Sequence, residues 1–317
     1  MQAVDKIIRA RLQSSVSMIP DLAEHLVGAG GKRLRPLLTI ASAHLCSKDG
    51  ASENHHKLAA AVEFIHLATL LHDDVVDLSA KRRGKKAANL IWGNAPSILV
   101  GDFLFARSFS LMVETGSIEA LGILSETSSI IAEGEVQQLA ALRDVDISMA
   151  TYLQVIGAKT GALFAAAAEV SPVISGASNA QRQAMKTYGQ ELGIAFQLVD
   201  DALDYGGFEA ALGKAVGDDF REGKMTLPVI HAYNQAKKNG HMDAQKFWQR
   251  VMRDNDQKNG DLAQAKHYLE MCNALQTTLD NARAHSNTAI AALSVFDASV
   301  WKDALVDLAA FVVDRVR

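Results

Sequence analysis

The chain has 317 residues, of which 49% are hydrophobic, enough for a sizeable core in one large domain or two. Its formal net charge of −4 argues against a general binder of polyanions such as nucleic acids. The two cysteines, Cys46 and Cys272, lack metal-ligand spacing and predict free thiols in a reducing compartment. The N-terminus lacks a signal-peptide apolar region, and no unbroken apolar run reaches about 18 residues, so we expect a cytosolic protein without a membrane-spanning helix.

Long apolar stretches without helix breakers predict an all-α protein. The stretch 54–77 carries Leu58, Val62, Ile65 and Leu70 at helical spacing, which indicates a long, mostly buried helix. Further helices are expected over residues 95–114, 118–142, 149–168, 180–204, 243–254, 262–284 and 297–316, with turn signals between them. No linker or shift in composition divides the chain, so we expect a single domain over residues 1–317.

Two acidic clusters of identical D-D-x-x-D spacing each follow a strongly apolar helix. The first consists of Asp73, Asp74 and Asp77, and the second of Asp200, Asp201 and Asp204. On a helix, residues i and i+4 share a face, and like charges at that spacing repel. Carboxylate oxygens suit Mg²⁺, which keeps several waters and is usually shared with substrate phosphates. Two such clusters therefore predict bound cations.

Basic residues accompany the acidic clusters along the chain. The segment 30–36 places Lys32, Arg33 and Arg35 after a glycine pair, with Pro36 expected at the first position of a helix. A second basic run spans residues 81–86, and further cations follow at Lys159, Lys214, Arg221 and Lys224. Carboxylates with Mg²⁺ and these cations together suit diphosphates, which arginine grips bidentately.

Each of these signals alone has a simpler interpretation. A basic cluster is most often a solvated surface, one acidic motif can be an exposed helix end, and His66 in an apolar helix is more often a core residue than a ligand. Nucleic-acid binding is disfavoured because the interleaved aspartates would repel the phosphate backbone. The conjunction of two matched acidic motifs, each followed by cations, favours a diphosphate site.

The chain resembles the trans-isoprenyl (polyprenyl) diphosphate synthases. The matching segments are residues 30–36, 64–84, 99–104, Lys159-Thr160, 196–205, and 213–228, and they lie in the correct order over roughly residues 4 to 235. Leu67, Leu78 and Gly161 depart from the family pattern without removing a charged group. The chain looks closest to the bacterial long-chain enzymes, the octaprenyl to decaprenyl diphosphate synthases that make ubiquinone side chains.

The resemblance implies a helical bundle around a central cavity, the isoprenoid synthase fold, usually as a homodimer. It implies head-to-tail condensation of isopentenyl diphosphate with an allylic diphosphate such as farnesyl diphosphate, with Mg²⁺ as cofactor and three ions when substrate is bound. Asp73, Asp77 and Asp200 would bind the metal, supported by Asp74, Asp201 and Asp204. Contacts to the allylic diphosphate would come from Arg82, Lys159, Gln197, Lys214 and Lys224. Isopentenyl diphosphate would lie against Lys32, Arg35, His66 and Arg83.

This reaction is consistent with the residues. Ionising an allylic C–O bond leaves a diphosphate and a carbocation, and fixed positive charge stabilises the departing diphosphate. Water must be excluded from the carbocation, which an apolar helical interior achieves. Thr160 and Gln197 are candidate stabilisers of the cation. The released diphosphate is the base that the family implies, since no protein base is evident.

Small residues before the first acidic motif bear on product length. Thr69 and Ile65 lie four and eight residues before Asp73 on one flank of the helix, with Ala68 beside them. In short-chain members of the family a bulky aromatic residue closes the pocket here, so Ala68 and Thr69 predict a long product. The simpler interpretation is that small residues allow close helix packing.

Other functions also fit the sequence. A shorter-chain farnesyl or geranylgeranyl diphosphate synthase is the main alternative. A class I terpene cyclase would not need the isopentenyl diphosphate residues, and a non-catalytic partner subunit typically loses acidic motifs. A very apolar product also suggests transient membrane contact at release.

Overall fold

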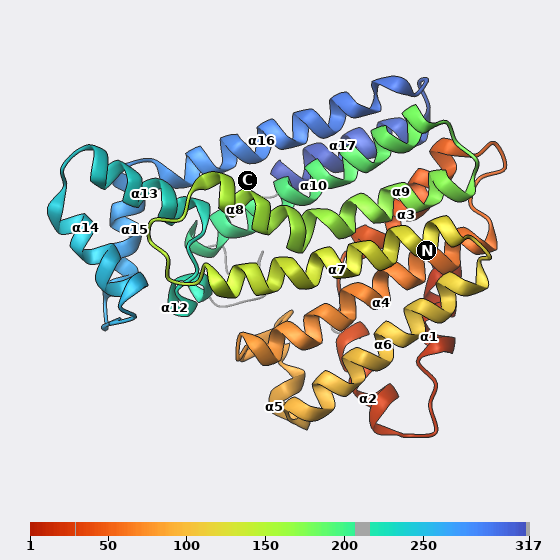
Figure 1. Ribbon diagram of the computed structural model, residues 1–317, viewed down its shortest axis with the longest axis horizontal. Coiled ribbons are helices and arrows are strands. Elements are labelled where there is room, and N and C mark those ends of the chain that lie inside the picture. The colour runs from red at the N-terminus through yellow and green to blue at the C-terminus, as the bar shows by residue number, and fades with distance from the viewer. Residues whose placement is uncertain (29, 207–215, 315–317) are drawn as a thin grey trace. The chain divides into compact units, whose positions relative to one another are not determined.

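Helices make up nearly all of the regular structure in the computed structural model, which describes residues 1–28, 30–206 and 216–314 (Figure 1). The chain divides into two compact units. Unit 1 comprises Met1–Ser129, Ala162–Gln190 and Ile290–Asp307, and unit 2 comprises Ile130–Gly161, Glu191–Ala289 and Leu308–Arg317. The prediction of an all-α protein is confirmed, and the single domain stays a prediction.

Unit 1 is built around a long buried helix. Its elements are α1 (Gln2–Arg11), α2 (Met18–Val27), α3 (Leu34–Cys46), α4 (Glu53–Val76), β1 (Lys81–Arg82), β2 (Lys85–Lys86), α5 (Ala88–Trp92), α6 (Asn94–Glu114), α9 (Ala162–Ile174) and the 3₁₀ helix η3 (Leu293–Val295). Helix α4 packs against α1, α3, α6 and α9. It begins in a capping box in which Ser52 and His55 satisfy each other's backbone amides. Since α4 ends at Val76, Asp73 and Asp74 lie in its last turn and Asp77 is the residue that caps it.

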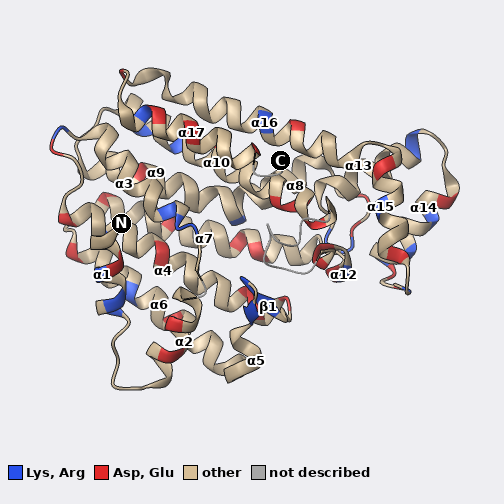
Figure 2. Cartoon of the chain, turned by 180° about the vertical axis from the view of Figure 1, so that it is seen from behind, with Lys and Arg blue, Asp and Glu red and all other residues tan. Residues whose placement is uncertain are grey.

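A two-stranded hairpin follows α4 directly. Strands β1 and β2 pair antiparallel, with Lys81 opposite Lys86 and Arg82 opposite Lys85. The turn residues Arg83 and Gly84 both have positive φ, 52° and 77°, as a type I′ turn requires. Figure 2 shows the basic residues of this hairpin in blue beside β1. The hairpin thus places Arg82 and Arg83 close behind the acidic motif.

Unit 2 has its own core, which includes Trp248, Tyr205, Leu198 and Phe220. Its elements are α8 (Met149–Ile156), the π-helical turn η1 (Gly157–Gly161), α12 (Asp218–Glu222), α13 (Leu227–Lys238), α14 (Met242–Trp248), the π-helical turn η2 (Gln249–Arg253) and α15 (Asp261–Met271). Four more helices have residues in both units: α7 (Ile118–Ala140), α10 (Asn179–Gly206), α16 (Ala274–Ala292) and α17 (Val300–Asp314).

Two local predictions are wrong. The helix expected over 262–284 is two helices, because Asn273 takes a left-handed conformation with φ 54° between α15 and α16. Pro36 is the third residue of α3, which begins at Leu34. Its missing N–H is still harmless there, because the first turn of a helix leaves its amides without intrahelical partners.

Two helical stretches, Asn94–Glu114 and Met149–Ile174, are long and apolar enough to cross a membrane by length and composition alone. This is weak evidence, since core helices of soluble proteins pass the same test, and 67% of the second window is buried. The absence of a spanning helix therefore stays a prediction.

Candidate active site

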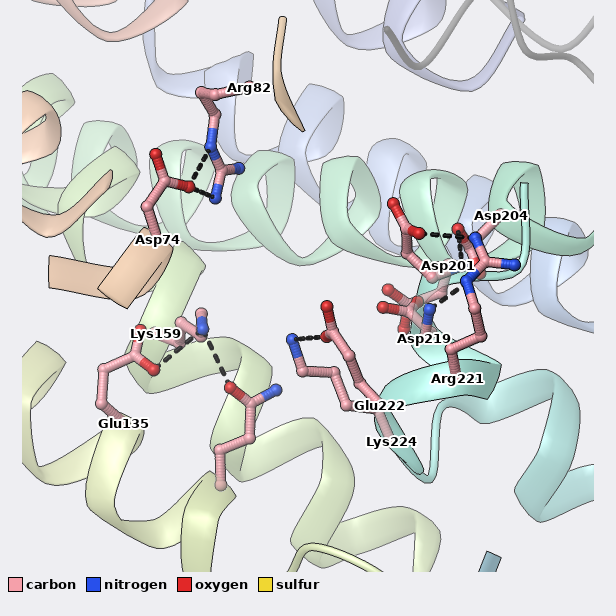
Figure 3. A network of polar contacts seen from close by, with 12 residues as sticks. Asp74, Arg82, Glu135, Lys159, Asp201, Asp204, Asp219, Arg221, Glu222 and Lys224 are labelled. Carbon is pink, nitrogen blue, oxygen red and sulfur yellow. Dashed lines mark hydrogen bonds and ion pairs between the residues drawn. The ribbon is translucent and has the colours of Figure 1, made fainter. Parts of the chain in front are cut away.

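The first acidic motif separates its carboxylates by burial. Asp73 and Asp77 are partly exposed, whereas Asp74 is completely buried. The guanidinium of Arg82 donates two hydrogen bonds to Oδ1 of Asp74, from Nε at 2.8 Å and from a terminal nitrogen at 2.5 Å (Figure 3). The Asn89 side chain donates to the backbone carbonyl of Asp74 at 2.9 Å. Asp74 therefore anchors the hairpin, while Asp73 and Asp77 keep access to solvent.

The residues assigned to isopentenyl diphosphate are partly brought together in unit 1. Arg35 contacts Nε2 of His66 at 3.2 Å, and its guanidinium stacks 4.3 Å from the ring centre of Phe164. Burial, with the nearby charges of Arg35, Arg83 and Arg82, lowers the pKa of His66 well below its usual value. The imidazole is therefore neutral and accepts from Arg35.

Arg83 approaches the glycine pair that precedes Lys32. Its guanidinium donates to the carbonyl of Gly30. A Cβ on Gly31 would lie only 2.7 Å from the same guanidinium, so the glycine allows this approach. Lys32 is exposed just before α3 begins. These contacts bring Arg83 to the loop that carries Lys32.

The second acidic motif also separates its carboxylates. Asp200 is partly exposed, whereas Asp201 and Asp204 are 3% and 5% exposed. Asp201 accepts hydrogen bonds from the Tyr152 hydroxyl and from Nε2 of Gln197, the latter at 2.8 Å. Burial and the charge of Asp219 raise the pKa of Asp201 to about 8, against the lowering effect of these two donors.

Asp204 ties α10 to the start of α12. Its two carboxylate oxygens accept from the backbone amides of Asp218 at 3.2 Å and Asp219 at 3.1 Å. Its backbone carbonyl accepts from Gly217 at 2.8 Å. Burial and Asp219 raise the pKa of Asp204 to about 7, although the two amides oppose this shift.

The lysines assigned to the allylic diphosphate are engaged by acceptors. Lys159 donates to Glu135 at 2.8 Å and to Gln138 at 2.9 Å, and Lys224 pairs with Glu222 at 2.6 Å (Figure 3). Lys159 and Thr160 lie in the π-helical turn, a distortion that is frequent at functional sites. Thr160 donates to Oε1 of Gln197 at 3.0 Å. Lys214 lies outside the described residues.

The three residues assigned to chain length lie on α4 as expected. Ile65 and Ala68 are completely buried. Thr69 is partly buried, and its hydroxyl donates to the carbonyl of His66 at 2.8 Å.

Three further residues of the site were not predicted. Glu63 is 4% exposed on α4, and burial raises its pKa although Arg35, Arg33 and Arg83 oppose the shift. The sequence feature that could have identified Glu63 is a single acidic residue within an apolar helix. Asp219 lies beside the second motif. In the sequence it belongs to an acidic pair that follows Gly217, which could have identified it. Tyr152 carried no signal, because its role depends on a contact with Asp201.

The donors present fit Mg²⁺. The partly exposed carboxylates Asp73, Asp77 and Asp200 are hard oxygen ligands of the kind that this ion prefers. Burial first, and the charge of Asp219 second, raise the pKa values of Asp201 and Asp204, and a divalent cation nearby would favour their ionised forms. Within the described ranges, no three His, Cys, Asp or Glu side chains are already grouped as a metal centre. Mg²⁺ usually takes only one or two protein carboxylates and shares the rest of its shell with phosphates and water.

Comparisons with known proteins agree with this arrangement. The family model described as polyprenyl synthetase matches residues 16–269. The chain is 42% identical to the octaprenyl diphosphate synthase of Escherichia coli strain K12, over 100% of this chain and 96% of that one. A polyprenyl synthase from Caulobacter crescentus CB15, solved with calcium and isoprenyl diphosphate, has a TM-score of 0.95 and 52% identity over 100% of this chain and 95% of that one. A decaprenyl diphosphate synthase from Rhodobacter capsulatus has a TM-score of 0.93 and 49% identity, covering 100% and 96%.

The helices and the two acidic motifs define an isoprenoid synthase fold. The chain belongs to the polyprenyl synthetase family and is a trans-prenyltransferase.

Proposed function

We propose that the chain condenses isopentenyl diphosphate head-to-tail with an allylic diphosphate to make a long all-trans polyprenyl diphosphate, octaprenyl to decaprenyl, for a quinone side chain. The observation that carries this proposal is the pair of complete D-D-x-x-D motifs, each with partly exposed and buried carboxylates. The similarity to octaprenyl and decaprenyl diphosphate synthases supports the long product. We place the protein in the cytosol, with transient membrane contact when the apolar product leaves.

In the proposed reaction, Asp73, Asp77 and Asp200 bind Mg²⁺, of which three ions accompany the bound substrate. When bound, Mg²⁺ neutralises the charge that develops on the departing diphosphate. Lys159 and Lys224 exchange their present acceptors for diphosphate oxygens, and Arg82, Gln197 and Lys214 also contact the diphosphate. Once they hold the diphosphate, the positively charged groups stabilise the charge that develops on it as it leaves.

The second substrate binds through Lys32, Arg35, His66 and Arg83. Arg35 and Arg83 supply fixed charge for its diphosphate, and the neutral imidazole of His66 orients Arg35. The alkene of isopentenyl diphosphate attacks the allylic carbocation, and a proton is then lost to the released diphosphate. Burial of the apolar residues on α4 keeps water away from the cation.

A homodimer is part of the proposal. On α6 and at the start of α7, Leu99, Val113 and Ile118 are 66%, 64% and 81% exposed. Exposed large apolar side chains that recur along a helix mark a candidate interaction surface. Light scattering of the purified chain tests this: a dimer supports it, and a monomer that is fully active contradicts it.

A product assay tests the activity. The chain is incubated with Mg²⁺, labelled isopentenyl diphosphate and farnesyl diphosphate, and the dephosphorylated products are sized by reversed-phase chromatography. A ladder ending between octaprenol and decaprenol supports the proposal. Asp200→Asn and a reaction with chelator are the controls. Products that stop at geranylgeraniol would indicate a short-chain synthase. If the folded chain incorporates no isopentenyl diphosphate, the proposed function is contradicted.

A further inference from the structure

Tyr152 makes a buried contact that no substrate-binding role explains. It lies on α8, is 4% exposed, and its hydroxyl donates to Oδ2 of Asp201. Asp201 is itself 3% exposed on α10. Without this bond the buried hydroxyl would lose its acceptor and Oδ2 of the buried carboxylate would lose its donor, at considerable cost.

The other oxygen of Asp201 determines the orientation of Gln197. Oδ1 accepts from Nε2 of Gln197 at 2.8 Å. Since the amide nitrogen points to Asp201, the amide oxygen must point the opposite way. It does so, because Oε1 of Gln197 accepts from the hydroxyl of Thr160 at 3.0 Å. The four side chains therefore form one chain of hydrogen bonds from Tyr152 to Thr160.

The orientation of the Gln197 amide matters if a positive charge forms beside it. With the amide in this orientation, Gln197 and Thr160 present oxygen lone pairs, which attract a carbocation. If the amide were reversed, its N–H groups would take that place and repel the cation. Thr160 belongs to the π-helical turn, so its hydroxyl is set by a local distortion of the helix.

We propose that Tyr152 is a positioning residue that acts through Asp201 to hold the Gln197 amide with its oxygen toward Thr160 and the allylic carbocation. This inference rests on the proposed prenyl transfer. Tyr152 touches neither substrate in this scheme. Its effect falls on the ionisation and condensation step, while the binding of isopentenyl diphosphate depends on other residues.

The test is the rate of the first condensation in a single turnover, with both substrates saturating. Tyr152→Phe should lower this rate about tenfold, the effect of one buried hydrogen bond, and leave the KM for isopentenyl diphosphate unchanged. Tyr188→Phe is the matched control. Tyr188 is also buried, but its hydroxyl donates to the backbone carbonyl of Leu305 at 2.6 Å, so removing this hydroxyl should leave the rate unchanged.

A double-mutant cycle separates positioning from a general loss of stability. In a Gln197→Leu background, Tyr152→Phe should have no further effect on the rate, because the amide that it positions is gone. An equal loss in both backgrounds would overturn the inference. Asp201→Asn is the second variant if Tyr152→Phe folds poorly. Its NH₂ group can face Gln197 and reverse the amide, so it should reproduce the loss.

The inference and the proposed function fail in different ways. If the wild-type chain does not incorporate isopentenyl diphosphate, the proposed function is wrong. If the wild-type chain elongates its product and both Tyr152→Phe and Asp201→Asn keep the full condensation rate, only the role of Tyr152 is wrong.

Discussion

Arg82 donates two hydrogen bonds to a single oxygen of Asp74, and Asp74 is completely buried. The middle aspartate of the first motif therefore holds the hairpin β1–β2 against the end of α4. The outer aspartates, Asp73 and Asp77, are partly exposed. One short motif thus contains a buried carboxylate that anchors an arginine and two partly exposed carboxylates, which bind a cation in the proposed function.

Replacing Asp74 should therefore cost stability as well as activity. Asp74→Ala leaves the Arg82 guanidinium, whose side chain is only 13% exposed, without its carboxylate partner. Removing one member of a buried ion pair costs about 3 to 5 kcal/mol. We expect a loss of unfolding free energy near the lower end, measured by urea denaturation. Asp73→Ala is the control and should change stability by less than about 1 kcal/mol while abolishing Mg²⁺-dependent activity. Equal losses of stability in Asp74→Ala and Asp73→Ala would contradict the separate roles of the two aspartates.

A second, partly buried ion pair predicts a pH dependence of stability. Arg250 donates two hydrogen bonds of 2.8 Å to the two carboxylate oxygens of Asp261, and the Lys258 amide donates a third at 2.7 Å. The hydrogen bond from Arg250 is the main cause that lowers the pKa of Asp261, against burial, which raises it. Because the folded-state pKa is lowered, this stabilisation is present above the unfolded value of about 3.9 and is lost as the pH falls below it.

The comparison of wild type with Asp261→Asn measures this contribution. At pH 7 the variant should be less stable by about 1.5 to 3 kcal/mol, the range for hydrogen bonds to charged groups. The difference should shrink as the pH falls below about 4. Urea denaturation at several pH values provides the free energies. A difference that stays constant down to pH 3 would contradict the role of the ionised carboxylate.

Gly134 on α7 lies against the π-helical turn that carries Lys159 and Thr160. A Cβ at this position would meet Cβ of Ala158 at 2.8 Å and the backbone nitrogen of Lys159 at 3.0 Å. Gly134→Ala should push this turn away, with a cost of about 1 to 3 kcal/mol and reduced activity. Gly122→Ala on the same helix meets nothing within 4 Å and should instead stabilise by up to about 1 kcal/mol. Thermal denaturation and the product assay compare the two; similar effects would contradict the packing argument.

Helix positions and the acidic motifs were predictable because their signals are local. Apolar periodicity located α4 and α6 to within about two residues, and identical spacing singled out both aspartate clusters. The break at Asn273 was not predictable, because apolar periodicity continues through it and only a backbone angle records the turn. For the hairpin after α4, the sequence predicted a turn but not the two strands, since strands of two residues carry no periodicity.

The supporting contacts of the site were less predictable than its charged residues. Nothing in the spacing of Tyr152 and Asp201 shows that their side chains meet, because they come from different helices. Similarly, the family resemblance implied that Asp204 supports the metal site, but it did not show that the Asp204 oxygens accept hydrogen bonds from the backbone amides of Asp218 and Asp219. Chemistry carried by one residue type at a fixed spacing is visible in a sequence, but pairing between distant segments depends on the fold.

The last prediction concerns product length and the small residues on α4. Ala68 is completely buried and Thr69 partly so, and both precede the acidic motif by about one helical turn. Ala68→Phe or Thr69→Tyr should shorten the product, because an aromatic ring on this flank blocks the path of the growing chain. The ring should also cost about 1 to 3 kcal/mol through overpacking. Chromatography of the dephosphorylated products measures length, and Ala132→Phe, at an exposed helical position, is the matched control. Unchanged product length in a folded, active Ala68→Phe variant would mean that small residues here serve only close helix packing, and that the end of the product path is set elsewhere.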